Sequence, residues 1–186
     1  FVGPSEETLR LFGDKVAARE LARSLSVPLL DGSVAPVSSD EAAAFFGSLG
    51  SGAAMAIKAV AGGGGRGIRI VTDAAEVGPM YERCRSEAAA AFGDGRLYIE
   101  RALPEARHIE VQTAADLTGA VIHLGERECS LQRRHQKIVE VAPAPSLDPA
   151  MRTRLTDAAL AMARAARLTG IATFEFLVDV SSPGAF

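Results

Sequence analysis

Four consecutive glycines, Gly62 to Gly65, stand between two short segments that have the composition of β-strands. Residues 55–60 (Met-Ala-Ile-Lys-Ala-Val) precede them and residues 68–71 (Ile-Arg-Ile-Val) follow Gly67, so the stretch predicts a glycine-rich hairpin. Glycine has no side chain, and the backbone N–H groups of such a hairpin can therefore approach anionic oxygens closely. A merely flexible turn is the alternative, although a turn needs fewer glycines.

The segment from Gly62 to Gly67 also satisfies the G-x-G-x-x-G pattern of dinucleotide-binding and protein-kinase loops. A dinucleotide-binding loop runs directly into a helix whose N-terminus meets the pyrophosphate, whereas here a strand follows. The Gly-Lys-Ser/Thr ending of a P-loop and the His-Arg-Asp and Asp-Phe-Gly signatures of kinases do not occur. We therefore expect a hairpin that folds over a triphosphate.

Helix and strand signals alternate along the rest of the chain. Around the hairpin the order is strand, hairpin, strand, helix, strand. One later strand alternates strictly, so that His108, Glu110 and Gln112 share a face opposite Ile109 and Val111. The predicted helices cover about 5–12, 14–26, 41–49 (opened by Asp40), 73–92 and 149–168, and the further strands cover about 96–100, 108–113, 120–125 and 173–180.

Composition limits the partners that this chain can have. Its 186 residues carry a net charge of −3 and a pI near 5.7, which argues against nucleic acid and anionic membrane surfaces as partners. No apolar run reaches the roughly 18 residues of a membrane span, and the first residues are not a basic and apolar leader. Two cysteines, Cys84 and Cys129, suggest neither a disulfide framework nor a metal cluster. We expect a soluble cytoplasmic protein.

Lysine is scarce, because the 20 basic residues comprise 17 arginines and only Lys15, Lys58 and Lys137. A chain that uses arginine this strongly would have arginine wherever an ordinary surface charge sufficed. Each lysine therefore suggests a position that requires a compact ammonium, which binds phosphate as a point charge. Lys58 shares its strand face with Ala56 and Val60, so its charge requires a partner. Lys137 ends the basic run 133–137, which predicts either a small anion site or an exposed charged loop.

Glu175 stands between Phe174 and Phe176 in a predicted strand. A carboxylate among large apolar side chains is costly unless it is paired, protonated or bound to a metal. Mg²⁺ takes oxygen ligands and works alongside substrate phosphates, so Glu175 is a candidate ligand. An outward-facing residue on a half-exposed strand is the alternative.

Four motifs occur along the chain in order: Gly13-Asp14-Lys15, Ile57-Lys58-Ala59 with the glycine hairpin, Arg107-His108-Ile109-Glu110, and HLGERECSLQRRHQK from His123 to Lys137. This set resembles the ATP-grasp region of biotin carboxylase over essentially the whole chain. The resemblance implies an α+β ATP-grasp fold, incomplete at its C-terminus and without the family's N-terminal domain. It implies a helical entry segment at 1–30 that packs on the larger subdomain, a lid at 31–102 and part of the larger subdomain at 103–186.

The resemblance also implies roles for single residues. Lys15 and Lys58 would hold the ATP phosphates under the hairpin, Lys137 would act at the bicarbonate and phosphate end as the catalytic residue, and Glu175 would bind a metal ion. The other implied ATP-binding residues are Gly62, Gly63, Gly64, Gly65, Arg66, Gly67, Glu100, Arg101, Leu103, His108, Gln132 and His135.

By the same resemblance the parent enzyme, an acyl-CoA carboxylase, pyruvate carboxylase or related protein, would use ATP, Mg²⁺ (or Mn²⁺) and bicarbonate to carboxylate biotin. Bicarbonate attacks the γ-phosphorus to give carboxyphosphate, which delivers CO₂ to the biotin nitrogen. A biotinylated carrier domain and a carboxyltransferase component would be partners, and the parent would be oligomeric. The family's second metal-binding glutamate and its bicarbonate-binding arginine have no counterpart here, so we expect this chain alone to be inactive.

Two alternatives remain from the sequence. One is a non-catalytic nucleotide-binding or assembly module that kept the fold without the chemistry. The other is a different ATP-grasp ligase, such as a half of carbamoyl phosphate synthetase, although the run from Arg133 to Lys137 argues against it.

Overall fold

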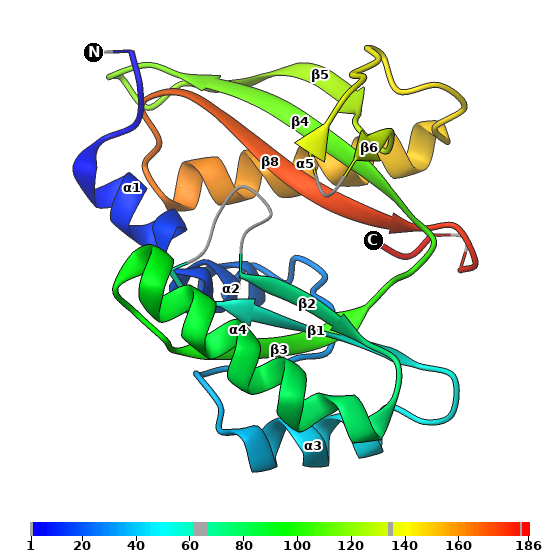
Figure 1. The fold of residues 1–186 in the computed structure, drawn as a ribbon. Helices are drawn as coiled ribbons and strands as arrows, with labels where there is room; N and C mark the ends of the chain where they lie inside the picture. The colour runs from blue at the N-terminus through cyan, green and yellow to red at the C-terminus, as the bar shows by residue number, and fades with distance from the viewer. Residues whose placement is uncertain (1, 62–66, 134–135, 183) are drawn as a thin grey trace. The chain divides into compact units, whose positions relative to one another are not determined.

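A computed structural model describes residues 2–61, 67–133, 136–182 and 184–186 (Figure 1). Its helices are α1 (Glu6–Gly13), α2 (Lys15–Ser24), α3 (Ser39–Ser48), the 3₁₀ turn η1 (Ala74–Glu76), α4 (Val77–Phe92) and α5 (Pro149–Ala165). Its strands are β1 (Ala54–Ala59), β2 (Ile68–Val71), β3 (Leu97–Ala102), β4 (Ala106–Ala115), β5 (Val121–Glu128), β6 (Gln132–Arg133), β7 (Gln136–Lys137) and β8 (Gly170–Asp179). The predicted order of strand, hairpin, strand, helix, strand around the glycines is confirmed by β1, β2, α4 and β3.

The chain divides into two compact units. Unit 1 contains Phe1–Gly13, Leu21–Pro28 and Glu105–Phe186, and unit 2 contains Asp14–Glu20 and Leu29–Pro104. Of the predicted entry segment 1–30, residues 1–13 and 21–28 group with unit 1, whereas residues 14–20 and 29–30 group with unit 2. The reason is polar bonding within that unit: the Lys15 Nζ donates to the Val60 carbonyl at 3.3 Å, and the Arg19 Nη2 donates to the Leu30 carbonyl at 2.7 Å.

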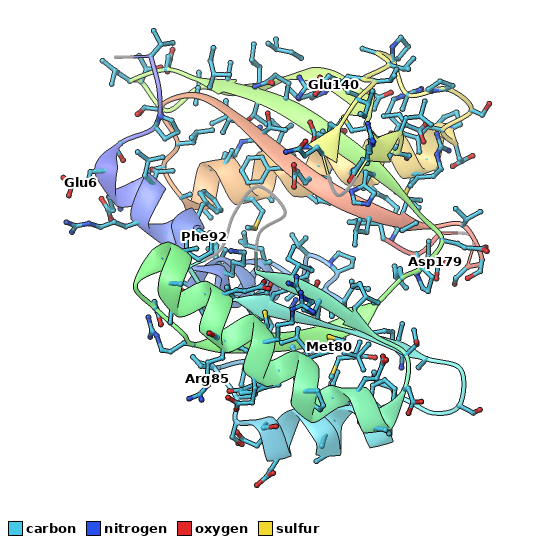
Figure 2. The ribbon with its side chains drawn as sticks, in the orientation of Figure 1. Glu6, Met80, Arg85, Phe92, Glu140 and Asp179 are labelled. Carbon is cyan, nitrogen blue, oxygen red and sulfur yellow. The ribbon has the colours of Figure 1, made fainter. Side chains whose placement is uncertain are left out.

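Unit 2 is built on an antiparallel sheet with the order β2-β1-β3. Helix α4 packs on one face of this sheet and α3 packs beside α4 (Figure 1). The buried residues of α4 recur every three or four positions, as one face of a helix requires. They are Val77, Tyr81, Cys84 and Ala88, and they meet Ile57 and Ile99 of the sheet in one core. Figure 2 labels Met80 and Phe92, two half-buried α4 side chains that pack against this core.

Local capping explains where three helices begin. We expected Asp40 to open α3, but the cap is Ser38, whose hydroxyl accepts from the Glu41 N–H while the Glu41 carboxylate accepts from the Ser38 N–H at 2.7 Å. This Ser-x-x-Glu arrangement is a capping box. The Asp14 carboxylate accepts from the first amides of α2, and the Asp148 carboxylate does the same for α5.

Unit 1 is built on an antiparallel sheet with the order β5-β4-β8, and α5 packs across β4 and β5 (Figure 1). Ile109 and Val111 face α5 and are fully buried, as the alternation of this strand predicts. Leu155 of α5 is also fully buried in this core, and Phe174 and Phe176 of β8 pack against it. The opposite face of the sheet therefore carries His108, Glu110 and Gln112 of β4 and Glu175 of β8.

Cys84 and Cys129 are free and buried, which agrees with the absence of a disulfide framework in the sequence. Within the described ranges, no helix combines the length and the apolarity that crossing a membrane would require.

Candidate functional site

A charged cluster in unit 2 forms around the carboxylate of Glu100 on β3. Lys58 of the neighbouring strand β1 pairs with one oxygen of this carboxylate, and the Arg19 Nη1 of α2 lies 3.1 Å from the other. Lys58 lies opposite Tyr98, and Ala56 lies opposite Glu100, so Lys58 and Glu100 are diagonal neighbours on one sheet face. The core residues of β1 and β3 occupy the other face, which leaves the charged pair on the face away from α4.

Lys15 adds a second ammonium to this cluster. It is the first residue of α2, and its Nζ donates to the Val60 carbonyl at 3.3 Å. Burial and the nearby charge of Lys58 lower the pKa of Lys15, against the opposing influence of Asp14 and Glu100. A cation at a helix N-terminus is also disfavoured by the helix dipole, so this arrangement is suited to an added anion.

The partner that the sequence required for Lys58 is therefore a carboxylate. Lys15 and Arg19 of α2 and Lys58 of β1 gather around Glu100 of β3. The exposed fractions of the Glu100, Arg19 and Lys58 side chains are 8%, 13% and 21%, so water screens these charges only in part.

The glycine hairpin is described only at its end. Gly62, Gly63, Gly64, Gly65 and Arg66 lie outside the described residues. Gly67 has a φ of +68°, and a Cβ built on it would lie 2.8 Å from the Cβ of Ala59. Its carbonyl accepts from the Ala59 N–H at 2.8 Å, which closes the ladder between β1 and β2. Only glycine fits this position without strain.

Arg101 and Leu103 lie at and just after the end of β3, and both are half-buried. The Arg101 N–H donates to the Asp31 carbonyl at 2.7 Å, and the Arg101 Nε lies 3.4 Å from the Asp31 carboxylate. The backbone amide of Arg101 is therefore engaged with the loop that follows α2.

A second charged cluster, in unit 1, forms around Glu110 on β4, whose side chain is only 3% exposed. Arg127 lies directly opposite it on β5, and Glu175 lies directly opposite it on β8. The Arg127 Nη2 donates to Glu110 at 2.8 Å, and Lys137 of β7 pairs with both Glu110 and Glu175. Arg127, Glu110 and Glu175 thus form one row across β5, β4 and β8, and the two carboxylates of this row both pair with Lys137.

Arg127 is the structural centre of this row. Its Nη1 donates to the Gln112 side chain at 3.1 Å, and its Nε lies 3.4 Å from the carboxylate of Glu140, which is labelled in Figure 2. The donor atoms of Glu110, Cys129 and Glu140 lie within 4.8 Å of one another, a spacing that could hold a metal ion. The Arg127 guanidinium already pairs with the carboxylates of Glu110 and Glu140, so it neutralises their negative charge without a metal ion.

The surroundings of Glu175 differ from the expectation. Its side chain is 65% exposed, because alternation along β8 directs it away from the face on which Phe174 and Phe176 pack. The idea that apolar neighbours enclose this carboxylate is wrong, and the outward-facing alternative describes its position. Glu175 and Glu110 nevertheless fit a magnesium site chemically, since Mg²⁺ is bound by one or two carboxylates together with phosphates.

The three other residues that the resemblance places around the nucleotide are described in part. The His108 N–H donates to the Ser130 hydroxyl at 3.0 Å, and the His108 carbonyl accepts from the Cys129 N–H at 2.8 Å. The Gln132 side chain donates to the Cys129 carbonyl at 3.0 Å, so the 129–130 segment connects β4 with β6. His135 lies outside the described residues.

The structure adds three residues that the sequence did not mark as site residues. Arg19 belongs to the cluster around Glu100, and Glu110 and Arg127 belong to the cluster in unit 1. A weak signal existed for Arg19, which lies four residues after Lys15 and so on the same helix face. Glu110 had a signal in its alternation with His108 and Gln112. Arg127 lies within the motif from His123 to Lys137, but nothing singled it out there, because its partners come from strands that only the folded chain brings together.

Residues 14–185 match the family described as the ATP-binding domain of the carbamoyl-phosphate synthase L chain. The chain belongs to this family. It is similar to pyruvate carboxylase of Bacillus subtilis (strain 168), with 48% identity over 178 residues, and to mitochondrial pyruvate carboxylase of Homo sapiens, with 48% identity over 179 residues. Both alignments cover 96% of this chain but only 15% of the relative, so the chain spans a small part of these proteins.

Comparison with solved structures also finds biotin carboxylases. The chain superposes on biotin carboxylase of Campylobacter jejuni with a TM-score of 0.92 and 44% identity, over 97% of this chain and 40% of that one. For the biotin carboxylase domain of the Hydrogenobacter thermophilus 2-oxoglutarate carboxylase, solved with MgADP, ADP and bicarbonate, the TM-score is 0.91 and the identity 38%, over 98% and 40% of the chains. The resemblance to biotin carboxylase and the ATP-grasp fold class are confirmed.

Proposed function

We propose that this chain is the ATP-binding region of a biotin carboxylase, which uses ATP and bicarbonate to carboxylate biotin on a carrier domain. The observation that carries the proposal lies in unit 2: Lys15 and Lys58 converge where β1 enters the glycine hairpin. Two ammonium groups beside a glycine-rich hairpin suit the phosphates of a nucleotide. The similarity to biotin carboxylases over nearly the whole chain supports the same reading.

In this proposal the residues of unit 2 bind the phosphates and the base. Lys15 and Lys58 hold the phosphate oxygens, and the hairpin of Gly62 to Gly67 closes over them. Glu100, Arg101 and Leu103 lie along the adenine side. The carboxylate of Glu100 is already engaged by two cations, so its contact with the base would come from its backbone.

The residues of unit 1 would contribute to binding of the nucleotide, the metal ion and bicarbonate. His108, Gln132 and His135 surround the ribose and base, and Glu175 binds Mg²⁺ or Mn²⁺. When bound, the metal ion neutralises phosphate charge. Lys137 has three N–H donors, and two carboxylates engage its ammonium, so a third donor can serve a phosphoryl oxygen as charge develops there.

We propose the same partners as the sequence suggested. These are a biotinylated carrier domain and a carboxyltransferase component in an oligomeric cytoplasmic enzyme, without nucleic acid or membrane. The Hydrogenobacter thermophilus domain was solved as a dimer, which supports an oligomer. We keep the domain boundaries of the lid, at 31–102, as a proposal as well.

The test is bicarbonate-dependent ATP hydrolysis by the full-length protein that contains this chain. We expect hydrolysis that requires bicarbonate and increases with added biotin. Hydrolysis that ignores biotin would instead indicate another ATP-grasp ligase, and ATP binding without any hydrolysis would indicate a non-catalytic nucleotide-binding module. For the isolated chain we expect calorimetry to give a dissociation constant for Mg²⁺-ATP above about 1 μM, which corresponds to a binding free energy smaller in magnitude than about 8 kcal/mol.

A further inference from the structure

We propose that Arg19 is a positioning residue of the phosphate site: it fixes the carboxylate of Glu100, which in turn holds the ammonium of Lys58. The inference rests on the proposed function and extends it to a residue that none of the motifs includes. It concerns unit 2 alone, because Arg19, Glu100 and Lys58 all belong to that unit.

Both terminal nitrogens of Arg19 are committed. The Nη1 donates to the Glu100 Oε2 at 3.1 Å, and the Nη2 donates to the Leu30 carbonyl at 2.7 Å. The guanidinium is planar and presents its donors in a fixed fork. Two contacts to different segments therefore hold the plane of the guanidinium, and with it the position of the Glu100 Oε2.

Glu100 divides its two oxygens between two cations. The Oε2 accepts from Arg19, and the Oε1 accepts from Lys58. Since a carboxylate rotates as one plane, the contact with Arg19 decides where the Oε1 lies. Without Arg19 the carboxylate is free to turn, and the four-carbon side chain of Lys58 loses its fixed end point.

A purely structural tie between α2 and β3 does not explain the composition of this cluster. Two cations, Arg19 and Lys58, share the one carboxylate of Glu100. The Arg19 Nε is buried and has no acceptor among the described residues, which is an energetic cost. An excess of buried positive charge is expected where an anion is to be bound.

The test uses the 186-residue chain and exploits its three lysines. Labelling with ¹⁵N-lysine gives three side-chain ammonium signals, assigned from the single Lys→Arg variants, and Arg19→Met and Arg19→Lys are compared with Arg83→Met. Arg83 is a matched control in unit 2, since its side chain is 66% exposed and pairs with Glu87 on the surface. Binding is measured by calorimetry with inorganic tripolyphosphate, which has no base or ribose.

We expect Arg19→Met to shift and sharpen the signal of Lys58 and to leave that of Lys137 unchanged. Its tripolyphosphate affinity should fall about tenfold, because small misplacements of a binding group carry penalties of this size. Arg19→Lys keeps the charge but not the planar guanidinium, so its affinity for tripolyphosphate should fall several-fold. Arg83→Met should bind tripolyphosphate as tightly as the wild type does. Circular dichroism confirms that each variant is folded.

An unchanged Lys58 signal in folded Arg19→Met would overturn the inference, and so would wild-type affinity in both Arg19 variants. Wild-type affinity in Arg19→Lys alone would show that the charge of Arg19 matters and its position does not, which also overturns it. If the wild-type chain binds no tripolyphosphate, the proposed function of this site fails, and the Lys58 signal reports separately on the contacts with Arg19.

Discussion

Replacing Glu110 with glutamine should destabilise unit 1 by about 2–3 kcal/mol, because charge-assisted hydrogen bonds are worth about 1.5–3 kcal/mol each and a broken buried ion pair costs more. The substitution keeps the size of the side chain and removes the anion that Arg127 and Lys137 share. The exposed fractions of these two cations are 27% and 31%, so water compensates them in part. They also keep Glu140 and Glu175 as partners, which limits the loss.

The assay must report on unit 1 specifically. The two tyrosines, Tyr81 and Tyr98, lie in unit 2, and the chain has no tryptophan, so intrinsic fluorescence reports on the wrong unit. Hydrogen exchange of β4 and β8 peptides, followed by mass spectrometry, avoids this problem. If exchange follows global opening of unit 1, the loss of 2–3 kcal/mol accelerates it about 30- to 150-fold.

Glu6→Gln is the control for this experiment. Its pair with Arg10 also lies in unit 1, but the two side chains are 78% and 80% exposed, so the change should cost about 0.5 kcal/mol or less. Equal exchange rates for Glu110→Gln and Glu6→Gln would refute the reasoning, because the Glu110 carboxylate would then contribute no more than a surface charge.

Three further predictions concern catalysis, acid stability and packing. If the proposed function holds, Lys58→Arg in the full-length protein should raise the Michaelis constant for ATP, and Lys137→Arg should chiefly lower turnover, each by about 10- to 100-fold, which steady-state kinetics would show. The hydrogen bonds from the Arg107 guanidinium lower the pKa of Glu128 below its ordinary value of 4.5. This pair therefore stabilises the fold fully at a pH above 4.5, and the stabilisation is lost as the pH falls through the lowered pKa. The stability of Glu128→Gln, followed by acid titration, should not show that loss. Leu155→Ala should cost about 2–5 kcal/mol in urea unfolding, because it empties a fully buried position.

Local patterns predicted most of the elements of this fold, and the error at β5 shows where they stop. We expected a strand ending at about residue 125 and then a polar run, but β5 continues to Glu128. Glu126 accepts from Arg152 of α5 at 2.8 Å, and Glu128 accepts from Arg107 of β4 at 2.5 Å. A polar segment can thus be a strand when distant partners satisfy its charges, and no local pattern reveals those partners.

The site was predictable to the extent that residue scarcity marked it. Lys15, Lys58 and Lys137 attracted attention because the chain has only three lysines, and the structure places each of them beside other charged groups. The arginines gave no such signal, since 17 of them are spread along the chain. Selecting Arg19 and Arg127 required the fold, because their carboxylate partners are 81 and 17 residues away in sequence.

The two clusters share one arrangement, although they lie in different units. In each, a nearly buried carboxylate on a strand accepts from one arginine and one lysine: Glu100 from Arg19 and Lys58, and Glu110 from Arg127 and Lys137.

The two cations suit different tasks. The planar fork of arginine makes several fixed contacts and holds the carboxylate in place, whereas the ammonium of lysine makes contacts in any direction and can exchange a carboxylate for a phosphate oxygen. An arginine in place of either lysine would keep the charge and lose this freedom. Under the proposed function the division also accounts for the composition, because a chain that uses arginine almost everywhere would retain lysine where a charge must be held first by the protein and then by its substrate.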